Sequence, residues 1–196
     1  MVFVLSINKF GNNNKLQQYG EDDFRSLYWG DSKGESAKKR YKQISQYIDL
    51  KQSNILEVGC GFGSFFKLGF DCKSYVGYDI NKKFIDIASK KYPNKKWVTK
   101  LPNNEFYFDA CICSGVAGNR GGPAWNPNLL KKFLKKLYKL SNKTFINFPS
   151  NRSDIRSEYV EYFSPEYVLS EALNITPNTT IIHKHRFDFL LILEHE

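Results

Sequence analysis

Ile55-Leu56-Glu57-Val58-Gly59-Cys60-Gly61-Phe62-Gly63 is the stretch that decides the fold. An apolar run that leads into glycines at alternate positions predicts a buried strand over Asn54 to Val58, followed by a sharp turn. Glycine allows left-handed backbone conformations and a close approach of a ligand, because no Cβ atom stands in the way. Gly59, Cys60 and Gly61 are therefore candidates for binding a ligand.

Two carboxylates flank this turn at informative positions. Asp79 ends the next predicted strand, 20 residues after Gly59, where a carboxylate can accept hydrogen bonds from both hydroxyls of a ribose. Glu57 stands two residues before Gly59, which suits a cationic amino group better than an anionic pyrophosphate. Nicotinamide and flavin sites favour the spacing GxGxxG, whereas this chain has GxGxG. A turn without a ligand and a nicotinamide oxidoreductase stay as alternatives.

The rest of the chain alternates short apolar runs with helical periodicity, which predicts βαβ units and a parallel sheet. Helical spacing predicts a first helix over Ser36 to Ile48, and cap signals predict later helices that start at Asn81, at Asn126-Pro127 (ending at Leu140) and at Ser164-Pro165. The predicted strands are 54–58, 74–80, 97–99, 106–113 and 144–148, and then an antiparallel pair, 179–182 and 187–193. This order predicts a doubly wound α/β fold.

Length and composition predict a single domain over residues 1–196, with 41% hydrophobic and 16% aromatic residues. The longest apolar runs, Val2 to Leu5 and Phe189 to Leu193, are far too short to cross a membrane, and no export signal is recognisable. The four cysteines have neither a CxxC nor a zinc-ligand spacing. We therefore expect a cytoplasmic protein with reduced cysteines and no metal site.

The net charge of +9 raises the question of a nucleic-acid partner. However, 23 of the 29 positive residues are lysines, whereas specific phosphate and base contacts favour arginine. The lysine-rich face of the helix that ends at Leu140 is typical of the solvated side of an amphipathic helix. A nucleic-acid partner is thus open but not favoured.

The glycine turn with Glu57 resembles the first motif of class I S-adenosylmethionine-dependent methyltransferases, E/DxGxGxG, and Tyr78-Asp79-Ile80 resembles their second motif. Further segments resemble a group of small, little-characterised bacterial-type members of that superfamily. These segments are Tyr28-Trp29-Gly30, Arg40-Tyr41, Asp109 to Gly115, Phe148 to Arg152 and Tyr162 to Glu166.

The resemblance implies a methyltransferase with S-adenosylmethionine as its cofactor, and a Rossmann-like sheet of seven mostly parallel strands whose last strand is antiparallel. The residues that it implies for the cofactor are Glu57, Gly59, Cys60, Gly61, Asp79, Ile80 and Arg40. One departure concerns the adenine, because Thr99-Lys100-Leu101 stands where many members place an acid for its amino group.

The methyl acceptor is expected at the loops that follow the strands, Ser114 to Trp125 and Pro149 to Asp154, with residues 1–50 as a lid over a core formed by 51–196. The candidate acceptor-binding residues are Trp29, Asn119, Arg120 and Arg152, although Arg152 and Asp154 could equally form a surface pair. No general base is assigned. We predict a small-molecule acceptor; the alternatives are an RNA or protein methyltransferase that uses the basic surface, and a non-catalytic module.

Overall fold

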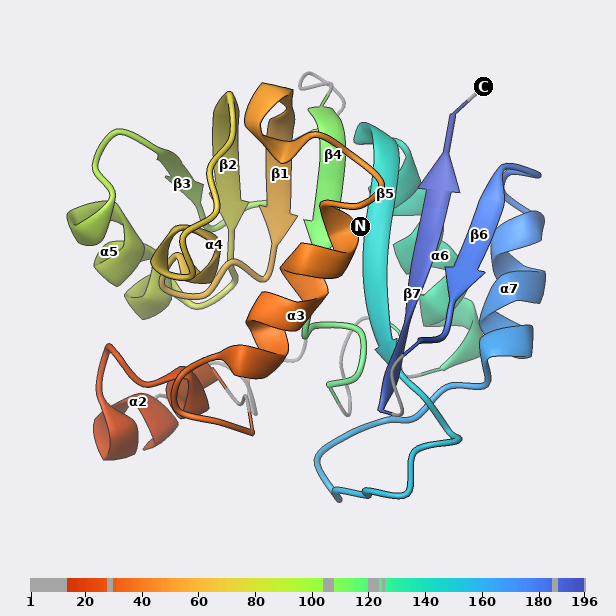
Figure 1. Cartoon of the computed structure of the whole chain (residues 1–196), viewed down its shortest axis with the longest axis horizontal. Coiled ribbons are helices and arrows are strands. Elements are labelled where there is room, and N and C mark those ends of the chain that lie inside the picture. The colour runs from red at the N-terminus through yellow and green to blue at the C-terminus, as the bar shows by residue number, and fades with distance from the viewer. Residues whose placement is uncertain are drawn as a thin grey trace. The chain divides into compact units, whose positions relative to one another are not determined.

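A seven-stranded sheet with the order β3-β2-β1-β4-β5-β7-β6 forms the centre of the computed structural model (Figure 1). The structure describes residues 14–27, 30–103, 108–119, 124, 126–184 and 187–195. The pairs β1–β2, β2–β3 and β4–β5 are parallel, whereas β7 is antiparallel to both β5 and β6. The predicted Rossmann-like fold with an antiparallel last strand is confirmed.

The chain divides into two compact units, of which the first comprises residues 1–101. Its strands are β1 (Asn54–Val58), β2 (Ser74–Tyr78) and β3 (Lys96–Val98). Its helices are α2 (Asn14–Tyr19), α3 (Glu35–Ile44), α4 (Ser64–Lys67) and α5 (Lys82–Lys91), with single 3₁₀ turns η1 (Phe24–Leu27) and η2 (Leu50–Gln52). Tyr41, Phe65 and Tyr75 belong to a buried aromatic core whose rings lie 5.5–5.8 Å apart.

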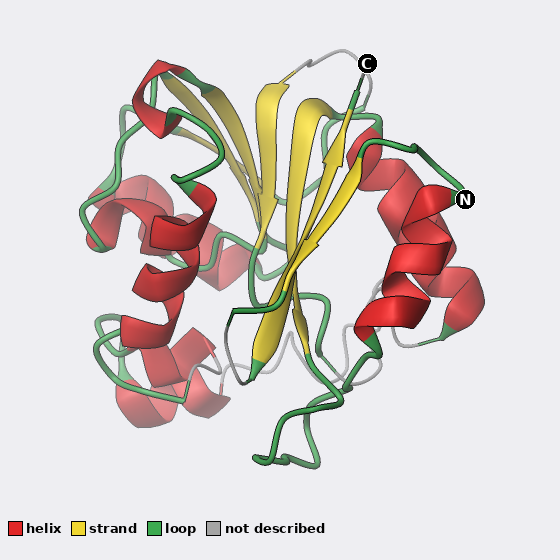
Figure 2. Ribbon diagram, turned by 45° about the vertical axis from the view of Figure 1, so that its right-hand side comes forward, coloured by secondary structure: helices red, strands yellow, loops and turns green. Residues whose placement is uncertain are grey.

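The second unit comprises residues 102–196. Its strands are β4 (Phe108–Cys113), β5 (Ser141–Pro149), β6 (Thr179–Ile182) and β7 (Asp188–Glu194), and its helices are α6 (Pro127–Tyr138) and α7 (Pro165–Leu173). α6 contacts β5, and α7 contacts β6 and β7, so both helices lie against these strands (Figure 2). α6 buries Leu130, Phe133, Leu134 and Leu137 and exposes its lysines, as the amphipathic pattern predicts.

The predicted helix caps are confirmed. The side chains of Asn81, Asn126 and Ser164 each accept a hydrogen bond from a backbone N–H in the first turn of α5, α6 and α7, at 3.0–3.2 Å. Such caps satisfy N–H groups that have no partner inside the helix.

Several predicted boundaries are wrong by a few residues. α3 ends at Ile44 rather than Ile48, because residues 45–48 turn the chain toward η2. β2 ends at Tyr78, and β3 covers 96–98 rather than 97–99. α6 ends at Tyr138 rather than Leu140, and β5 begins at Ser141, since pairing with β4 starts there. β7 covers 188–194 rather than 187–193. Residues 106–107 of the predicted fourth strand lie outside the described residues.

The exposed hydrophobic side chains are unevenly distributed. All large ones that are exposed among the described residues lie in the second unit: Ile155, Tyr159, Tyr167, Leu173 and Phe187.

The four cysteines are buried and form no disulfide. Within the described ranges, no helix is long and apolar enough to cross a membrane.

Candidate functional site

The turn after β1 adopts backbone conformations that only glycine tolerates well. Gly59, Gly61 and Gly63 have φ angles of 80°, 56° and 89°, in the left-handed region. A Cβ atom on Gly61 would lie 2.7 Å from the side chain of Leu27, and one on Gly63 would lie 2.6 Å from Tyr92. The N–H groups of Gly59 and Cys60 donate to the carbonyl of Tyr78, at 2.8 and 3.1 Å, which ties the turn to the end of β2.

Asp79 follows β2 directly and joins the two predicted motifs. Its Oδ2 accepts a hydrogen bond from the N–H of Gly61 at 3.0 Å, and its Oδ1 accepts one from the N–H of Asn81 at 2.8 Å. Burial raises the pKa of Asp79 to about 6. An ionised carboxylate can accept about four hydrogen bonds, so two sites remain for the hydroxyls of a ligand. Ile80, the next residue, is half-buried.

Glu57 lies in the core, with 1% of its surface exposed. Its Oε1 accepts a hydrogen bond from the hydroxyl of Tyr41 on α3, and its Oε2 accepts one from the hydroxyl of Tyr75 on β2. Burial raises the pKa of Glu57 to about 7, although the two tyrosine hydrogen bonds act in the opposite direction. The sequence did not predict these two hydrogen bonds, because the spacing of the two tyrosines is also that of ordinary core residues.

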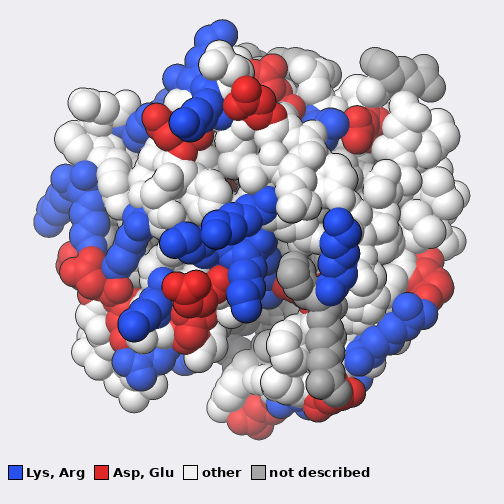
Figure 3. Space-filling model, viewed as in Figure 1, with Lys and Arg blue, Asp and Glu red and all other residues white. Residues whose placement is uncertain are grey.

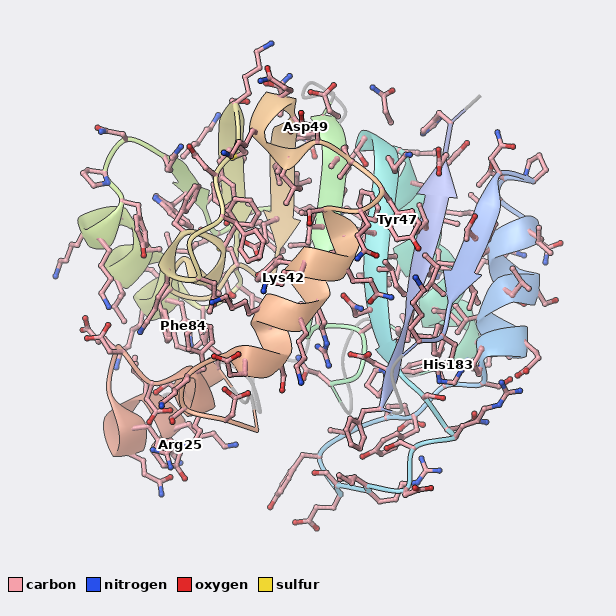
Figure 4. The ribbon with its side chains drawn as sticks, in the orientation of Figure 1. Arg25, Lys42, Tyr47, Asp49, Phe84 and His183 are labelled. Carbon is pink, nitrogen blue, oxygen red and sulfur yellow. The ribbon has the colours of Figure 1, made fainter. Side chains whose placement is uncertain are left out.

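The N-terminal segment packs on the glycine turn within the first unit. Phe24 lies edge-on to Phe62, with ring centroids 5.9 Å apart, and Leu27 packs against the cluster of Phe62, Phe84 and Ile87. Phe84 is labelled in Figure 4. Asp22 pairs with Lys67 of α4 at 3.1 Å and with Lys91 of α5 at 2.8 Å. Arg40 is half-buried on α3, next to Tyr41.

The acceptor candidates of the second unit lie on two loops that pair with each other. Asn119 forms an isolated antiparallel bridge with Val160, and the N–H of Glu161 donates to the carbonyl of Gly118 at 2.9 Å. Arg152 is exposed, and its guanidinium pairs with Glu166 in the first turn of α7. Trp29 and Arg120 lie outside the described residues, as does Trp125.

The glycine turn and Asp79 fit the binding of S-adenosylmethionine. The glycines of the turn carry no Cβ atoms, and Asp79 beside the turn accepts only two hydrogen bonds from described groups, which leaves acceptor sites for a ligand. α4 is only one turn long, so the turn and the carboxylate supply this fit rather than a helix dipole. In the described part of the chain, no three His, Cys, Asp or Glu side chains are grouped as metal ligands would be.

Comparison with known proteins agrees with this geometry. A family model described as "Methyltransferase domain" matches residues 56–140. The chain is 30% identical over 118 residues to a tRNA U34 carboxymethyltransferase of Pseudomonas paraeruginosa, covering 55% of this chain and 37% of that protein. It is 34% identical over 70 residues to ribosomal RNA small subunit methyltransferase A of Mesomycoplasma hyopneumoniae, covering 35% of this chain and 26% of that protein. The matched part of the chain thus spans 37% and 26% of the length of these two curated relatives.

Solved structures share the fold at low sequence identity. The magnesium protoporphyrin IX methyltransferase of Synechocystis with bound SAM superposes with a TM-score of 0.66 and 14% identity, covering 94% of this chain and 93% of that one. An S-adenosylmethionine-dependent methyltransferase of Clostridium acetobutylicum gives a TM-score of 0.63 and 12% identity, covering 87% of this chain and 95% of that one.

Proposed function

The chain carries a class I S-adenosylmethionine-dependent methyltransferase domain, and from this premise we propose that it binds S-adenosylmethionine and transfers the methyl group to a small-molecule acceptor. The observation that carries the proposal is the hydrogen bond between Asp79 and the N–H of Gly61, because it joins the acid of the second motif to the glycines of the first.

The proposed cofactor-binding residues all belong to the first unit. Asp79 would accept the ribose hydroxyls, and the backbone from Gly59 to Gly61, with Cys60 and Ile80 as neighbours, would line the remainder. Glu57, fixed by Tyr41 and Tyr75 at the end of β1, is proposed to lie beside the cofactor's cationic amino group. Arg40 is proposed to reach the cofactor's carboxylate. When bound, the cofactor supplies an electrophilic methyl group on a sulfonium.

The acceptor is proposed to be positioned by this chain rather than activated by a strong base. Methyl transfer proceeds by in-line displacement, so most of the rate enhancement can come from orientation of the reactants. Asn119, Arg120, Arg152 and Trp29 remain the proposed acceptor contacts. Residues 1–50 are proposed as the lid of a single domain, which Leu27 against Gly61 and the two lysine pairs of Asp22 support.

Calorimetric titration tests the cofactor directly. We expect S-adenosylmethionine and S-adenosylhomocysteine to bind and NAD not to bind. Asp79→Ala should lower the affinity for S-adenosylhomocysteine about ten- to a hundredfold, because hydrogen bonds to a charged group contribute about 1.5–3 kcal/mol. Asp86→Ala, which removes an exposed acid of α5 that pairs with Lys82, is the matched control and should keep the affinity. Unchanged affinity in a folded Asp79→Ala protein would remove the assignment.

An RNA acceptor is the second candidate. The tRNA carboxymethyltransferase and the ribosomal RNA methyltransferase to which the chain is similar support it. So does the charge distribution, since residues 1–101 hold 18 basic and 10 acidic residues, against 11 and 10 in residues 102–196.

A further inference from the structure

Two buried polar side chains of the second unit have no hydrogen-bond partner among the described residues. Asn147 on β5 is 2% exposed, and neither its amide nitrogen nor its amide oxygen is bonded. Ser114, which directly follows β4, is 6% exposed, and its hydroxyl is not bonded. Buried polar groups of folded proteins are almost always paired, so these two side chains indicate a partner other than the described residues.

The other buried hydroxyls described in this unit are all hydrogen-bonded. Each of them takes part in at least one hydrogen bond within the unit: Ser141, Thr144, Ser150, Ser153 and Thr176. The two exceptions are therefore a local feature and not a general looseness of the packing.

The two unpaired side chains are neighbours. β4 and β5 run parallel and pair as far as Cys113 and Ile146, and Ser114 and Asn147 are the residues that directly follow this last pair. Because paired strands lie about 5 Å apart, the two residues are close in space. Thr144, three residues before Asn147, donates to the carbonyl of Leu137 on α6, so Asn147 points to the face opposite α6.

Their position in the sheet is the one at which doubly wound folds bind ligands. Ser114 and Asn147 stand at the carboxyl ends of two adjacent strands, and the loops that follow carry the acceptor candidates Asn119 and Arg152. Those loops are joined to each other by the Glu161–Gly118 hydrogen bond, which gives the region a fixed border.

The side chains of Ser114 and Asn147 indicate which kind of chemical group they can bind. An amide and a hydroxyl each donate and accept, so together they match a group that does both. Neither is charged, and the nearest residues on the face of Asn147 are apolar: Ile112, Phe145 and Leu190, the last opposite Asn147 on β7. The buried Asp188 follows on the same face, opposite Pro149. An anionic group would lose its hydration here and would meet an acidic side chain instead of a countercharge. We propose that Ser114 and Asn147 form a subsite for a neutral, hydroxyl- or amide-bearing part of the methyl acceptor, an inference that rests on the proposed function.

Saturation-transfer NMR on the full chain with S-adenosylhomocysteine present tests this subsite. The probes are neutral sugars and nucleosides, each compared with its phosphate ester. We expect a neutral probe to bind the wild type, and Asn147→Leu and Ser114→Ala to weaken it about tenfold or more. Thr144→Val, a buried hydroxyl of β5 on the opposite face, is the matched control and should keep the binding.

Two further measurements distinguish a failure of the subsite proposal from a failure of the proposed function. Asn147→Leu removes two unpaired polar atoms from the interior, so it should melt at or above the wild-type temperature; a lower melting temperature would mean that the amide already has partners, and would overturn the proposal. So would the absence of binding by any neutral probe, or equal binding in Asn147→Leu. Calorimetry with S-adenosylhomocysteine tests the proposed function separately, because its failure to bind the wild type would contradict that function itself.

Discussion

At the scale of single residues, Glu57 shows how this chain uses an ionisable group away from solvent. Burial disfavours its charged form, while the hydroxyls of Tyr41 and Tyr75 partly replace the lost water. With a pKa of about 7 in the folded protein and 4.5 as the ordinary value, the native state binds more protons than the unfolded state between these two pH values. Stability should therefore fall as the pH rises through this window.

We expect Glu57→Gln to remove that part of the pH dependence. The wild type should lose about 3 kcal/mol relative to Glu57→Gln between pH 4.5 and pH 8, since each pKa unit corresponds to about 1.4 kcal/mol. Urea unfolding at a series of pH values measures this difference. Tyr75→Phe is a useful companion, because it deletes one hydrogen bond that lowers the pKa and should move the window upward. A wild type that gains stability relative to Glu57→Gln over the same range would contradict the assignment.

At the scale of elements, α3 has two different faces. Its buried face brings Tyr41 to Glu57, and its other face carries Lys38, Lys39 and Lys42, which form no ion pair with described residues. Basic side chains gather in the middle of the face drawn in Figure 3, where Figure 1 shows α3, and Lys42 is labelled in Figure 4. Lys67, Lys82, Lys91 and Lys95, by contrast, all pair with acids.

If RNA is the acceptor, α3 should be its phosphate contact. Replacing Lys38, Lys39 and Lys42 by Gln should reduce the salt dependence of RNA binding, with a slope smaller by about 2 to 3, because each phosphate contact contributes about 0.7 to 0.9. Fluorescence anisotropy of a labelled RNA hairpin, titrated at several salt concentrations, gives this slope.

α6 supplies a matched control for that experiment. Lys131, Lys132 and Lys135 repeat the same spacing on exposed positions, so their replacement by Gln removes the same charge from a different helix. Equal losses in the two triple variants would show that only the net charge matters, and would count against α3 as the binding element.

At the scale of the whole molecule, the sequence predicted what local patterns determine. The alternation of strands and helices, the three capped helices and the meeting of Asp79 with the glycine turn follow from periodicity, cap residues and motif spacing, whereas the seven-stranded sheet was implied by the family resemblance. The missed features depend on contacts between distant segments. Tyr41 bonds to Glu57 across 16 positions, Arg152 pairs with Glu166 rather than with a neighbour in sequence, and Ser114 and Asn147 come close only because β4 pairs with β5. No spacing rule encodes such contacts, because packing selects them.

The reactivity of the four buried cysteines can be used to follow unfolding. Cys60 and Cys72 lie in the first unit, and Cys111 and Cys113 in the second. Burial raises the pKa of Cys60 and Cys111 far above the usual value and that of Cys72 to about 11, so the reactive thiolate is scarce until the chain opens. Iodoacetamide labelling in mild denaturant, followed by peptide mass spectrometry, would measure the rate at which each unit exposes its cysteines. A single cooperative domain should label both pairs at one rate, whereas two rates would reveal an intermediate with one unit still closed.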